Sequence, residues 1–299
     1  MSRPLFGLLH CTLVCALGYY LPISSKLTTD YEGNVDFMLP FPESRMHAAI
    51  RHLQALTEKL PPSVSSIIFL SECLTSDLKL IASDDWIRQT YNITDVNGNY
   101  WQSDRYGTTA LIDKRLPIVA CFRVHFSKTA MDRDGLFVDV EFDGGKTVRL
   151  CNTHLESLIA DPPLRPAQMQ TCASYMHADS VCGAILAGDL NATQEYDKHL
   201  HTDNRLKDAY LERGGQEDDA EAGHTWGQQA ATAARERFGT TRMDKIYFCG
   251  SVQCTLFERF GADVQIDNED ERKQIVDAGF DKPWATDHLG VHAMFELSN

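Results

Sequence analysis

The sequence has no pair of cysteines separated by two residues, although it contains nine cysteines among its 299 residues. Zinc sites built from cysteine usually use closely spaced pairs, so this distribution argues against such a site. Most of the cysteines lie in or beside apolar stretches, which is typical of free, buried thiols in a reducing compartment. They are Cys11, Cys15, Cys73, Cys121, Cys151, Cys172, Cys182, Cys249 and Cys254.

Positive charge is also scarce. The chain has 28 Lys and Arg residues against 42 Asp and Glu residues, for a net charge of −14. Such a chain repels a polyanion at long range unless its cationic side chains gather on one face. This charge therefore argues against a general nucleic-acid-coating protein. An enzyme that engages only a few phosphates through a bound cation remains compatible with this charge.

Internal repeats, low-complexity tracts and long apolar runs are absent as well, which argues against solenoids. The most apolar stretch, residues 5–21, is short for a membrane-spanning helix and is interrupted by polar residues at 10–12. With small residues at Ala16 and Gly18 it resembles a weak signal peptide. We expect an intracellular protein, and secretion stays open as the alternative. A glycan on the Asn191 sequon would block that residue if it works in a cleft.

The remaining composition is that of a globular enzyme, with 43% hydrophobic and 23% charged residues. Apolar residues at helical spacing predict helices over 43–60 and 165–179. Alternating stretches around residues 143–145 predict a β-hairpin. Strands interleaved with helices indicate a layered α/β fold. We expect residues 228–237 to form a mobile or helical loop, and residues 266–274 to form a solvated charged loop.

Polar residues lie directly after several of the predicted strands. In "GDLN", Asp189 and Asn191 come directly after a buried strand. Taken alone, this pair is explained equally well by a turn, since Asp and Asn bond their own backbone. The other segments of this kind are Glu72 after "IIFLS", "NTHLES" (152–157), "RMDKIY" (242–247) and "TDHLG" (286–290).

In this order and spacing, these segments resemble the endonuclease/exonuclease/phosphatase superfamily over about residues 34–297. "NTHLES" followed by the RxxQ element Arg165–Gln168 is most similar to the tyrosyl-DNA phosphodiesterase 2 group and its fungal-type relatives. The resemblance implies a four-layer α/β sandwich, in which two packed mixed β-sheets are flanked by helices. It divides the chain into an atypical N-terminal segment, 1–33, and one domain, 34–299.

The resemblance also implies a role for individual residues. It implies a Mg²⁺ ion, or Mn²⁺ in its place, held by Glu72 and Asp287, and an Asp189 that orients or deprotonates the attacking water. A carboxylate accepts a proton and a carboxamide donates to an oxyanion, which explains an Asp followed by an Asn. The other implied residues are Asn191, His154 and His288 as donors to the phosphate, Asp244 as a supporting residue, and Asn34 at the end of the first strand.

Trp226 in "HTWG" matches an aromatic wall of the family's substrate groove, and a simple core tryptophan is the alternative. Thr108 and Thr109 either line the site or only fill a strand. The polar "KLTTDYEG" before Asn34 differs from the apolar first strand of the family.

The function implied by the resemblance is hydrolysis of a phosphodiester, with a 5'-tyrosyl DNA end as substrate, in nuclear or cytoplasmic DNA repair. We expect a monomer without a stable membrane partner. Two alternatives stay open at this point. The first is a nuclease or a lipid or small-molecule phosphoesterase that uses the same site. The second is a non-catalytic phosphate-binding module with a damaged N-terminus.

Overall fold

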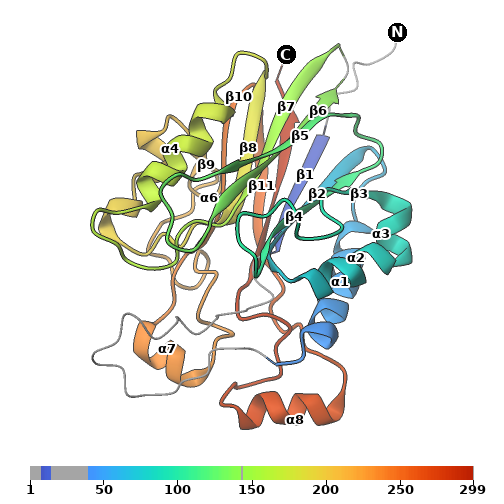
Figure 1. Cartoon of the computed structure of the whole chain (residues 1–299), viewed down its shortest axis with the longest axis vertical. Coiled ribbons are helices and arrows are strands. Elements are labelled where there is room, and N and C mark those ends of the chain that lie inside the picture. Colours follow the sequence, from blue (N-terminus) through green and yellow to red (C-terminus); the bar gives the residue numbers. More distant parts are fainter. Residues whose placement is uncertain (1–7, 15–39, 143, 299) are drawn as a thin grey trace.

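The computed structural model of the chain describes residues 8–14, 40–142 and 144–298. Two six-stranded sheets form its centre, in the orders β11-β12-β1-β2-β4-β3 and β5-β6-β7-β8-β10-β9. Helices lie along the outer sides of the pair (Figure 1). The predicted sandwich of two mixed sheets flanked by helices is therefore confirmed. Asn34 and most of the N-terminal segment lie outside the described residues.

The first sheet has one parallel strand pair among antiparallel neighbours. β1 lies parallel to β2 and antiparallel to β12, so it occupies a central position of the sheet. This strand comes from the segment before residue 34, while the predicted domain boundary itself stays a prediction. The strands are β1 (Leu8–Val14), β2 (Val64–Cys73), β3 (Tyr91–Ile93), β4 (Gly107–Asp113), β11 (Val252–Phe260) and β12 (Gly290–Leu297).

The second sheet repeats this pattern, with the parallel pair β7–β8 among antiparallel neighbours. The predicted hairpin is confirmed, because β6 and β7 pair down to Phe142 and Lys146. The strands are β5 (Ile118–His125), β6 (Asp134–Phe142), β7 (Lys146–Thr153), β8 (Gly183–Asp189), β9 (Lys207–Asp208) and β10 (Asp244–Gly250).

Three apolar clusters hold the layers together. The cluster between the sheets contains Phe69, Leu150 and Ile185. Burying one such side chain stabilises the fold by about 1.5–3 kcal/mol. The other two clusters join helices to the outer faces of the sheets. Ile50 of α1 and Ile68 of β2 belong to the cluster on the first sheet. Met169 and Leu186 belong to the cluster on the second sheet. The helices on the first sheet are α1 (Pro42–Thr57), α2 (Thr75–Ser83) and α3 (Asp85–Thr90), and the long helix on the second is α4 (Arg165–Met176).

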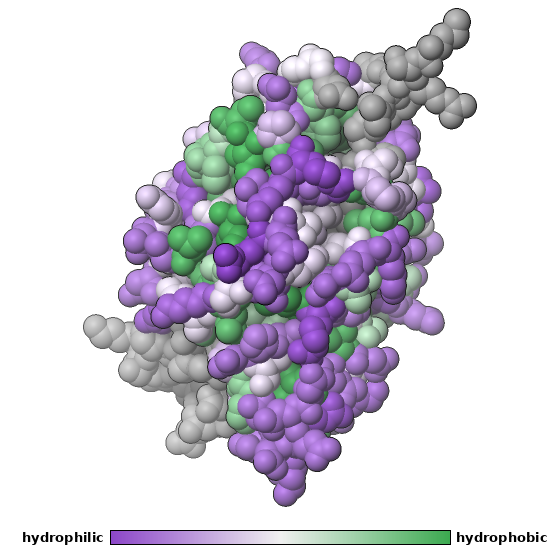
Figure 2. Space-filling view, turned by 90° about the vertical axis from the view of Figure 1, so that its right-hand side faces the viewer, coloured by the Kyte–Doolittle hydropathy of each residue, from purple (hydrophilic) through white to green (hydrophobic). Residues whose placement is uncertain are grey.

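The surface around α1, α2 and α3 faces the viewer in Figure 2. It is mostly hydrophilic with small separate hydrophobic areas, and its lowest part, where α8 lies, is almost entirely hydrophilic. Among the described residues, no helix is long and apolar enough to span a membrane. The remaining short elements are η1 (Glu195–Asp197), α5 (Leu200–Asp203), α6 (Ala209–Glu212), α7 (Thr232–Phe238) and α8 (Glu269–Asp277).

The predicted loop over residues 266–274 is wrong, because helix α8 begins at Glu269. The Oδ1 atom of Asn268 accepts hydrogen bonds from the backbone N–H groups of Asp270 and Glu271, both at 3.1 Å. This N-cap starts the helix despite its charged composition, and the buried Ile275 fixes it to the body of the protein.

Candidate active site

The two sheets are joined by a hydrogen-bonded amide close to the predicted residues. The Nδ2 atom of Asn152 in β7 donates to the carbonyl oxygen of Leu70 in β2 at 3.1 Å, and to that of Thr109 in β4 at 2.9 Å. Leu70 precedes Glu72 by two residues, as Asn152 precedes His154. This link therefore brings Glu72 of the first sheet opposite His154 of the second.

Glu72 lies inside β2 at a point where the pairing with β4 is irregular, between Leu70 and Cys73. Its φ angle is 55°, in the left-handed region that residues other than glycine rarely adopt. Irregularities of this kind re-aim a side chain away from its regular direction. The Glu72 side chain is buried, and its Oε1 atom lies 3.9 Å from Nε2 of His154.

Asp189 ends β8 and uses its two carboxylate oxygens for different contacts. Oδ1 accepts the backbone N–H of Asn191 at 2.9 Å, so the turn interpretation of "GDLN" describes a real contact. Oδ2 lies 3.3 Å from Nε2 of His154. Asn191, at a φ angle of 46°, donates from Nδ2 to the carbonyl oxygen of Leu155 and to Oγ of Ser157. The turn and a site carboxylate are therefore compatible in one residue.

His288 enters from the loop before β12. Its Nδ1 atom lies 2.8 Å from Oδ2 of Asp244, and Asp244 pairs with Asp189 across β10 and β8. Ligand atoms of Asp189, Asp244 and His288 all lie within 4.8 Å of one another. β12 begins at Gly290, two residues after His288.

Trp226 is connected to this cluster by its backbone and its side chain. It forms an isolated bridge with His288, and its Nε1 donates to Oδ2 of Asp287 at 3.2 Å. These contacts place the half-buried Trp226 beside the cluster, and its role as a wall of a substrate groove stays a prediction. Thr108 lines a neighbouring pocket, whereas Thr109 is fully buried and Thr94 lies 3.2 Å from its hydroxyl.

The two carboxyl groups beside His154 differ in charge. Burial raises the pKa of Glu72 to about 7, and the nearby negative charges of Asp287 and Asp189 add to this effect. Burial acts in the same direction on Asp189, but its contact with His154 and the charge of His288 outweigh burial and hold its pKa well below the ordinary value. Asp189 is therefore ionised at neutral pH, while Glu72 gains and loses its proton near neutrality.

The two histidines differ as well. Burial lowers the pKa of His154 to about 4, and the positive charge of Arg133 contributes to this, so His154 is neutral at pH 7. Burial also opposes the charged form of His288. The negative charges of Asp244, Asp287 and Asp189 outweigh that effect and raise the pKa of His288 well above 6.5. The site thus contains one neutral and one cationic imidazole at neutral pH.

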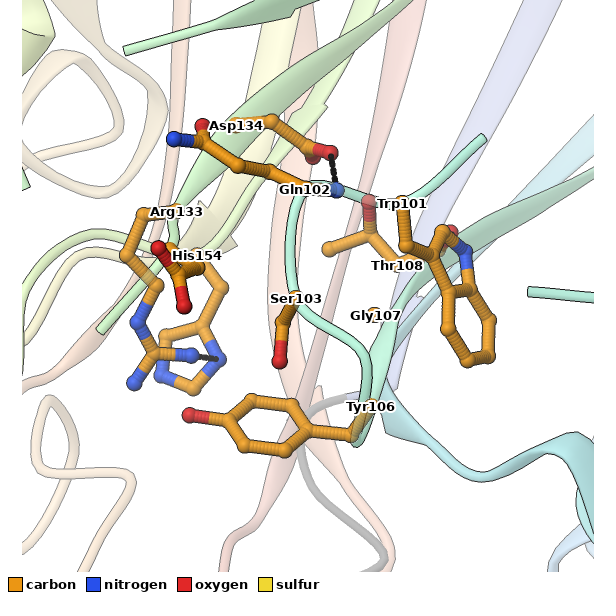
Figure 3. A pocket seen from close by; sticks show the side chains of 10 residues that line it. Trp101, Gln102, Ser103, Tyr106, Gly107, Thr108, Arg133, Asp134 and His154 are labelled. Atoms are coloured by element: carbon orange, nitrogen blue, oxygen red, sulfur yellow. Dashed lines mark hydrogen bonds between the residues drawn. The ribbon is translucent and has the colours of Figure 1, made fainter. Parts of the chain in front are cut away.

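Three residues near His154 belong to none of the motifs: Arg133, Tyr106 and Trp101. Arg133, directly before β6, lies with Nη1 2.7 Å from Nδ1 of His154 and donates from Nη2 to Oγ of Ser157 at 2.8 Å. Its guanidinium carbon is 5.1 Å from the centre of the Tyr106 ring. Figure 3 shows Arg133, His154 and Tyr106 around a pocket that Trp101 also lines. An arginine before a strand carries no motif signal, because its partners are distant in sequence.

The RxxQ element supports the turn after β7. Gln168 accepts the backbone N–H of Glu156 at 3.0 Å and donates to its carboxylate at 3.1 Å. Arg165 donates to the carbonyl oxygen of Glu156 at 3.0 Å and forms a buried ion pair with Asp197 at 2.7 Å. These residues therefore hold the His154–Ser157 turn from behind and do not enter the site.

The donor groups suit a divalent cation of the hard type. The carboxylates of Glu72, Asp189 and Asp244 are buried, and the half-buried Asp287 lies near enough to Glu72 for their charges to interact. Oxygen donors are those that Mg²⁺ prefers. The Oδ1 atom of Asp287 is buried without a hydrogen-bond partner among the described residues. Burial raises the pKa of Glu72, and the negative charges of Asp287 and Asp189 add to this effect, so a bound cation would favour the ionised form.

Comparisons with known proteins agree with this arrangement. The sequence model of the Endonuclease/Exonuclease/phosphatase family matches residues 32–288. A 5'-tyrosyl-DNA phosphodiesterase of Caenorhabditis briggsae is 28% identical over 211 residues, which cover 67% of this chain and 54% of the relative. The chain thus spans about half the length of this curated relative.

Two crystal structures of TDP2 from D. rerio share the fold. A version humanized by 14 mutations has a TM-score of 0.65 at 18% identity, and the match covers 96% of this chain and 98% of that one. The protein complexed with a single-strand DNA product has a TM-score of 0.64 at 18% identity, with the same coverage. At this identity the likeness establishes the fold alone.

Proposed function

Because the chain belongs to the endonuclease/exonuclease/phosphatase family, we propose that it is a hydrolase of phosphodiester bonds whose substrate is a 5'-tyrosyl DNA end. One observation carries the proposal: Glu72 from one sheet and Asp189 from the other lie against the same nitrogen of His154. The curated relative with the name 5'-tyrosyl-DNA phosphodiesterase supports the choice of substrate.

In this proposal the charge state of each side chain determines its role. Ionised Asp189 orients or deprotonates the attacking water, since general bases must be free of a proton. Cationic His288, fixed by Asp244, donates to a phosphoryl oxygen as negative charge develops on it. Neutral His154 and Asn191 provide further polar contacts to the same phosphate, and Trp226 forms a wall for the substrate.

A divalent cation, Mg²⁺ or Mn²⁺, is part of the proposal. Glu72 and Asp287 would hold it, and it would neutralise charge on a nonbridging oxygen of the phosphate. Ionised Glu72 is required for this, so the raised pKa of its carboxyl group couples cation binding to proton release.

The test is the release of tyrosine from a 5'-tyrosyl oligonucleotide by the purified full chain in Mg²⁺. We expect turnover that is lost on chelation. The matched variant is Asp189→Asn, which keeps an oxygen able to accept the Asn191 N–H while it removes the base. Its kcat should fall by about 10³-fold, within the range for loss of a general base, with an unchanged circular dichroism spectrum.

The same assay distinguishes the alternative substrates. Plain single-stranded DNA and an inositol phosphate are offered under identical conditions, since a nuclease would prefer the first and a small-molecule phosphoesterase the second. Binding of the tyrosyl oligonucleotide without turnover, by a correctly folded protein in Mg²⁺, would identify a phosphate-binding module and overturn the enzymatic proposal.

A further inference from the structure

The hydrogen bond between Arg133 and His154 has only one chemically allowed direction. Arginine has five N–H donors, no acceptor, and a charge that it keeps in proteins. The Nη1 atom of Arg133 lies 2.7 Å from Nδ1 of His154, as the dashed line in Figure 3 shows. Nδ1 must therefore be the unprotonated nitrogen of the ring.

From this geometry we propose that Arg133 is a positioning residue that holds His154 in the neutral tautomer with the proton on Nε2. In that tautomer the protonated Nε2 lies 3.3 Å from Oδ2 of Asp189 and 3.9 Å from Oε1 of Glu72. His154 is then a hydrogen-bond donor on the side of the carboxylates, and it has no lone pair there with which to ligate a cation.

The other two forms of the ring are disfavoured by the same contacts. The tautomer with the proton on Nδ1 would oppose an Arg133 N–H with another N–H, and would turn the Nε2 lone pair toward the Asp189 carboxylate. The imidazolium form would place a second positive charge at 2.7 Å from the guanidinium in a buried environment.

Arg133 is itself held rigidly, as a positioning residue must be. It is 4% exposed, its Nη2 donates to Oγ of Ser157 at 2.8 Å, and the Tyr106 ring lies beside its guanidinium. The loop before it is fixed by Glu156, whose carboxylate accepts the Thr129 hydroxyl at 3.0 Å. The side chain therefore reaches His154 from a defined direction.

The tautomer concerns the protein without any ligand, and only its catalytic consequence rests on the proposed function. A donor in the correct place contributes to catalysis because it stabilises charge that develops on the phosphate. Loss of Arg133 should then lower kcat/KM on the tyrosyl substrate by about 10²-fold, which is typical for the loss of one such donor.

The test is heteronuclear NMR of the metal-free full chain with ¹⁵N-labelled histidine at pH 7. The ring signals of His154, one of eleven histidines, are assigned by their loss in His154→Gln. We expect an unprotonated Nδ1 and a protonated Nε2. A wild-type spectrum with a protonated Nδ1 would overturn the proposal without the need for any variant.

Variants then separate positioning from general stability. In Arg133→Met we expect the His154 signals to change to a tautomer mixture or to the doubly protonated form, and Arg133→Lys should restore part of the original signature. Arg149→Met is the matched control, because it removes another buried arginine, paired with Asp139, from the same sheet. It should leave the His154 signals unchanged. An unchanged His154 tautomer in Arg133→Met would contradict the proposal.

The two proposals fail in different measurements. A protein that shows the expected His154 tautomer but does not cleave the tyrosyl substrate refutes the proposed function alone. A protein that cleaves this substrate with His154 in another ring form refutes the role of Arg133 alone.

Discussion

Two of the candidate site residues have left-handed backbones, Glu72 with φ of 55° and Asn191 with φ of 46°. Asparagine tolerates this conformation better than most residues, whereas a buried glutamate pays for it with about 1–3 kcal/mol of strain. Glu72 is also a buried carboxyl group among other carboxylates. Both features lower the stability of the fold, which is expected where a side chain is held for binding.

Glu72→Gln should therefore stabilise the metal-free protein in a pH-dependent way. The carboxyl group has a pKa of about 7 in the folded state against an ordinary 4.5, so its contribution to stability is complete below pH 4.5 and is lost as the pH rises through 7. The difference in the free energy of unfolding between Glu72→Gln and wild type should shift in favour of the variant by up to about 3 kcal/mol between pH 4.5 and pH 8. Urea unfolding with a chelator measures this. A pH-independent difference would contradict it, and the exposed Glu236→Gln is the control.

Added Mg²⁺ should offset most of that difference at pH 8. A ligand that binds only the folded state raises its stability, by about 2.7 kcal/mol at a concentration of 100 times Kd. Wild type should gain in melting temperature, and Glu72→Gln should gain much less because it lacks the anionic ligand. Equal gains in both proteins would show that the cation does not bind at Glu72.

β10 carries Asp244 toward the site and Lys245 away from it, and the neighbourhood of Lys245 is a buried ion network. Lys245 donates to Glu217 at 2.7 Å, Arg242 pairs with Glu217, and Arg242 also pairs with Asp208 at 2.7 Å. Removing one partner from such a network leaves a buried charge uncompensated. Glu217 thus fixes the strand that holds Asp244 in register.

Glu217→Gln should destabilise this strand in a defined pH range. Burial opposes ionisation, but Lys245 and Arg242 lower the pKa of Glu217 to about 2. Its contribution to stability is therefore present above the ordinary 4.5 and is lost as the pH falls toward 2. The variant should lose roughly 2–3 kcal/mol at pH 7 and progressively less below pH 4.5, measured by urea unfolding. A loss that does not change between pH 7 and pH 3 would contradict the role of the charge.

Elements were predictable where a periodic pattern is strong. The spacing over 43–60 predicts α1, and the alternation on both sides of residues 143–145 predicts β6 and β7, because both patterns repeat within a few residues. α8 was missed because its helix depends on the Asn268 cap and on one buried Ile275 in a charged segment. A single buried residue does not produce a periodic pattern of apolar residues in the sequence.

The candidate site, too, could be predicted only in part from the sequence. The motifs name Glu72, Asp189 and His288, and the structure brings them together, while their roles stay predictions. Arg133 could not be found from the sequence, because its value depends on a contact with His154 across neighbouring strands. Sequence shows residue types near strand ends, but only the packing of the two sheets shows which groups face each other.

The placement of β1 makes the N-terminal segment a part of the whole molecule. β1 pairs with β2 along residues 8–14 and with β12 along residues 8–13. Deletion of residues 1–14 should leave β2 and β12 each without the partner on one side, so that this edge of each strand exposes backbone groups that β1 had paired. We expect the shortened chain to lose cooperative thermal unfolding. A chain that lacks residues 1–14 but melts cooperatively near the wild-type temperature would show that this strand is dispensable.

The charge of the whole molecule sets how the proposed substrate is held. With a net charge of −14, long-range attraction of a DNA strand is absent, and binding depends on the few groups that meet one phosphate. Each neutralised phosphate of a single strand contributes a slope of about −0.7 to the logarithm of affinity against the logarithm of salt concentration. Contact with one or two phosphates therefore predicts a slope near −1.

Between 50 and 200 mM NaCl at constant Mg²⁺, kcat/KM for a 5'-tyrosyl oligonucleotide should then fall by only about four-fold, and oligonucleotides of about 4 and 20 nucleotides should react alike. A protein with an extended cationic groove would lose 10²-fold or more over the same range and would prefer the longer strand. That result would mean that cations distant from His154 and His288 contribute to binding, and that the acidic surface does not limit recognition to the reacting end.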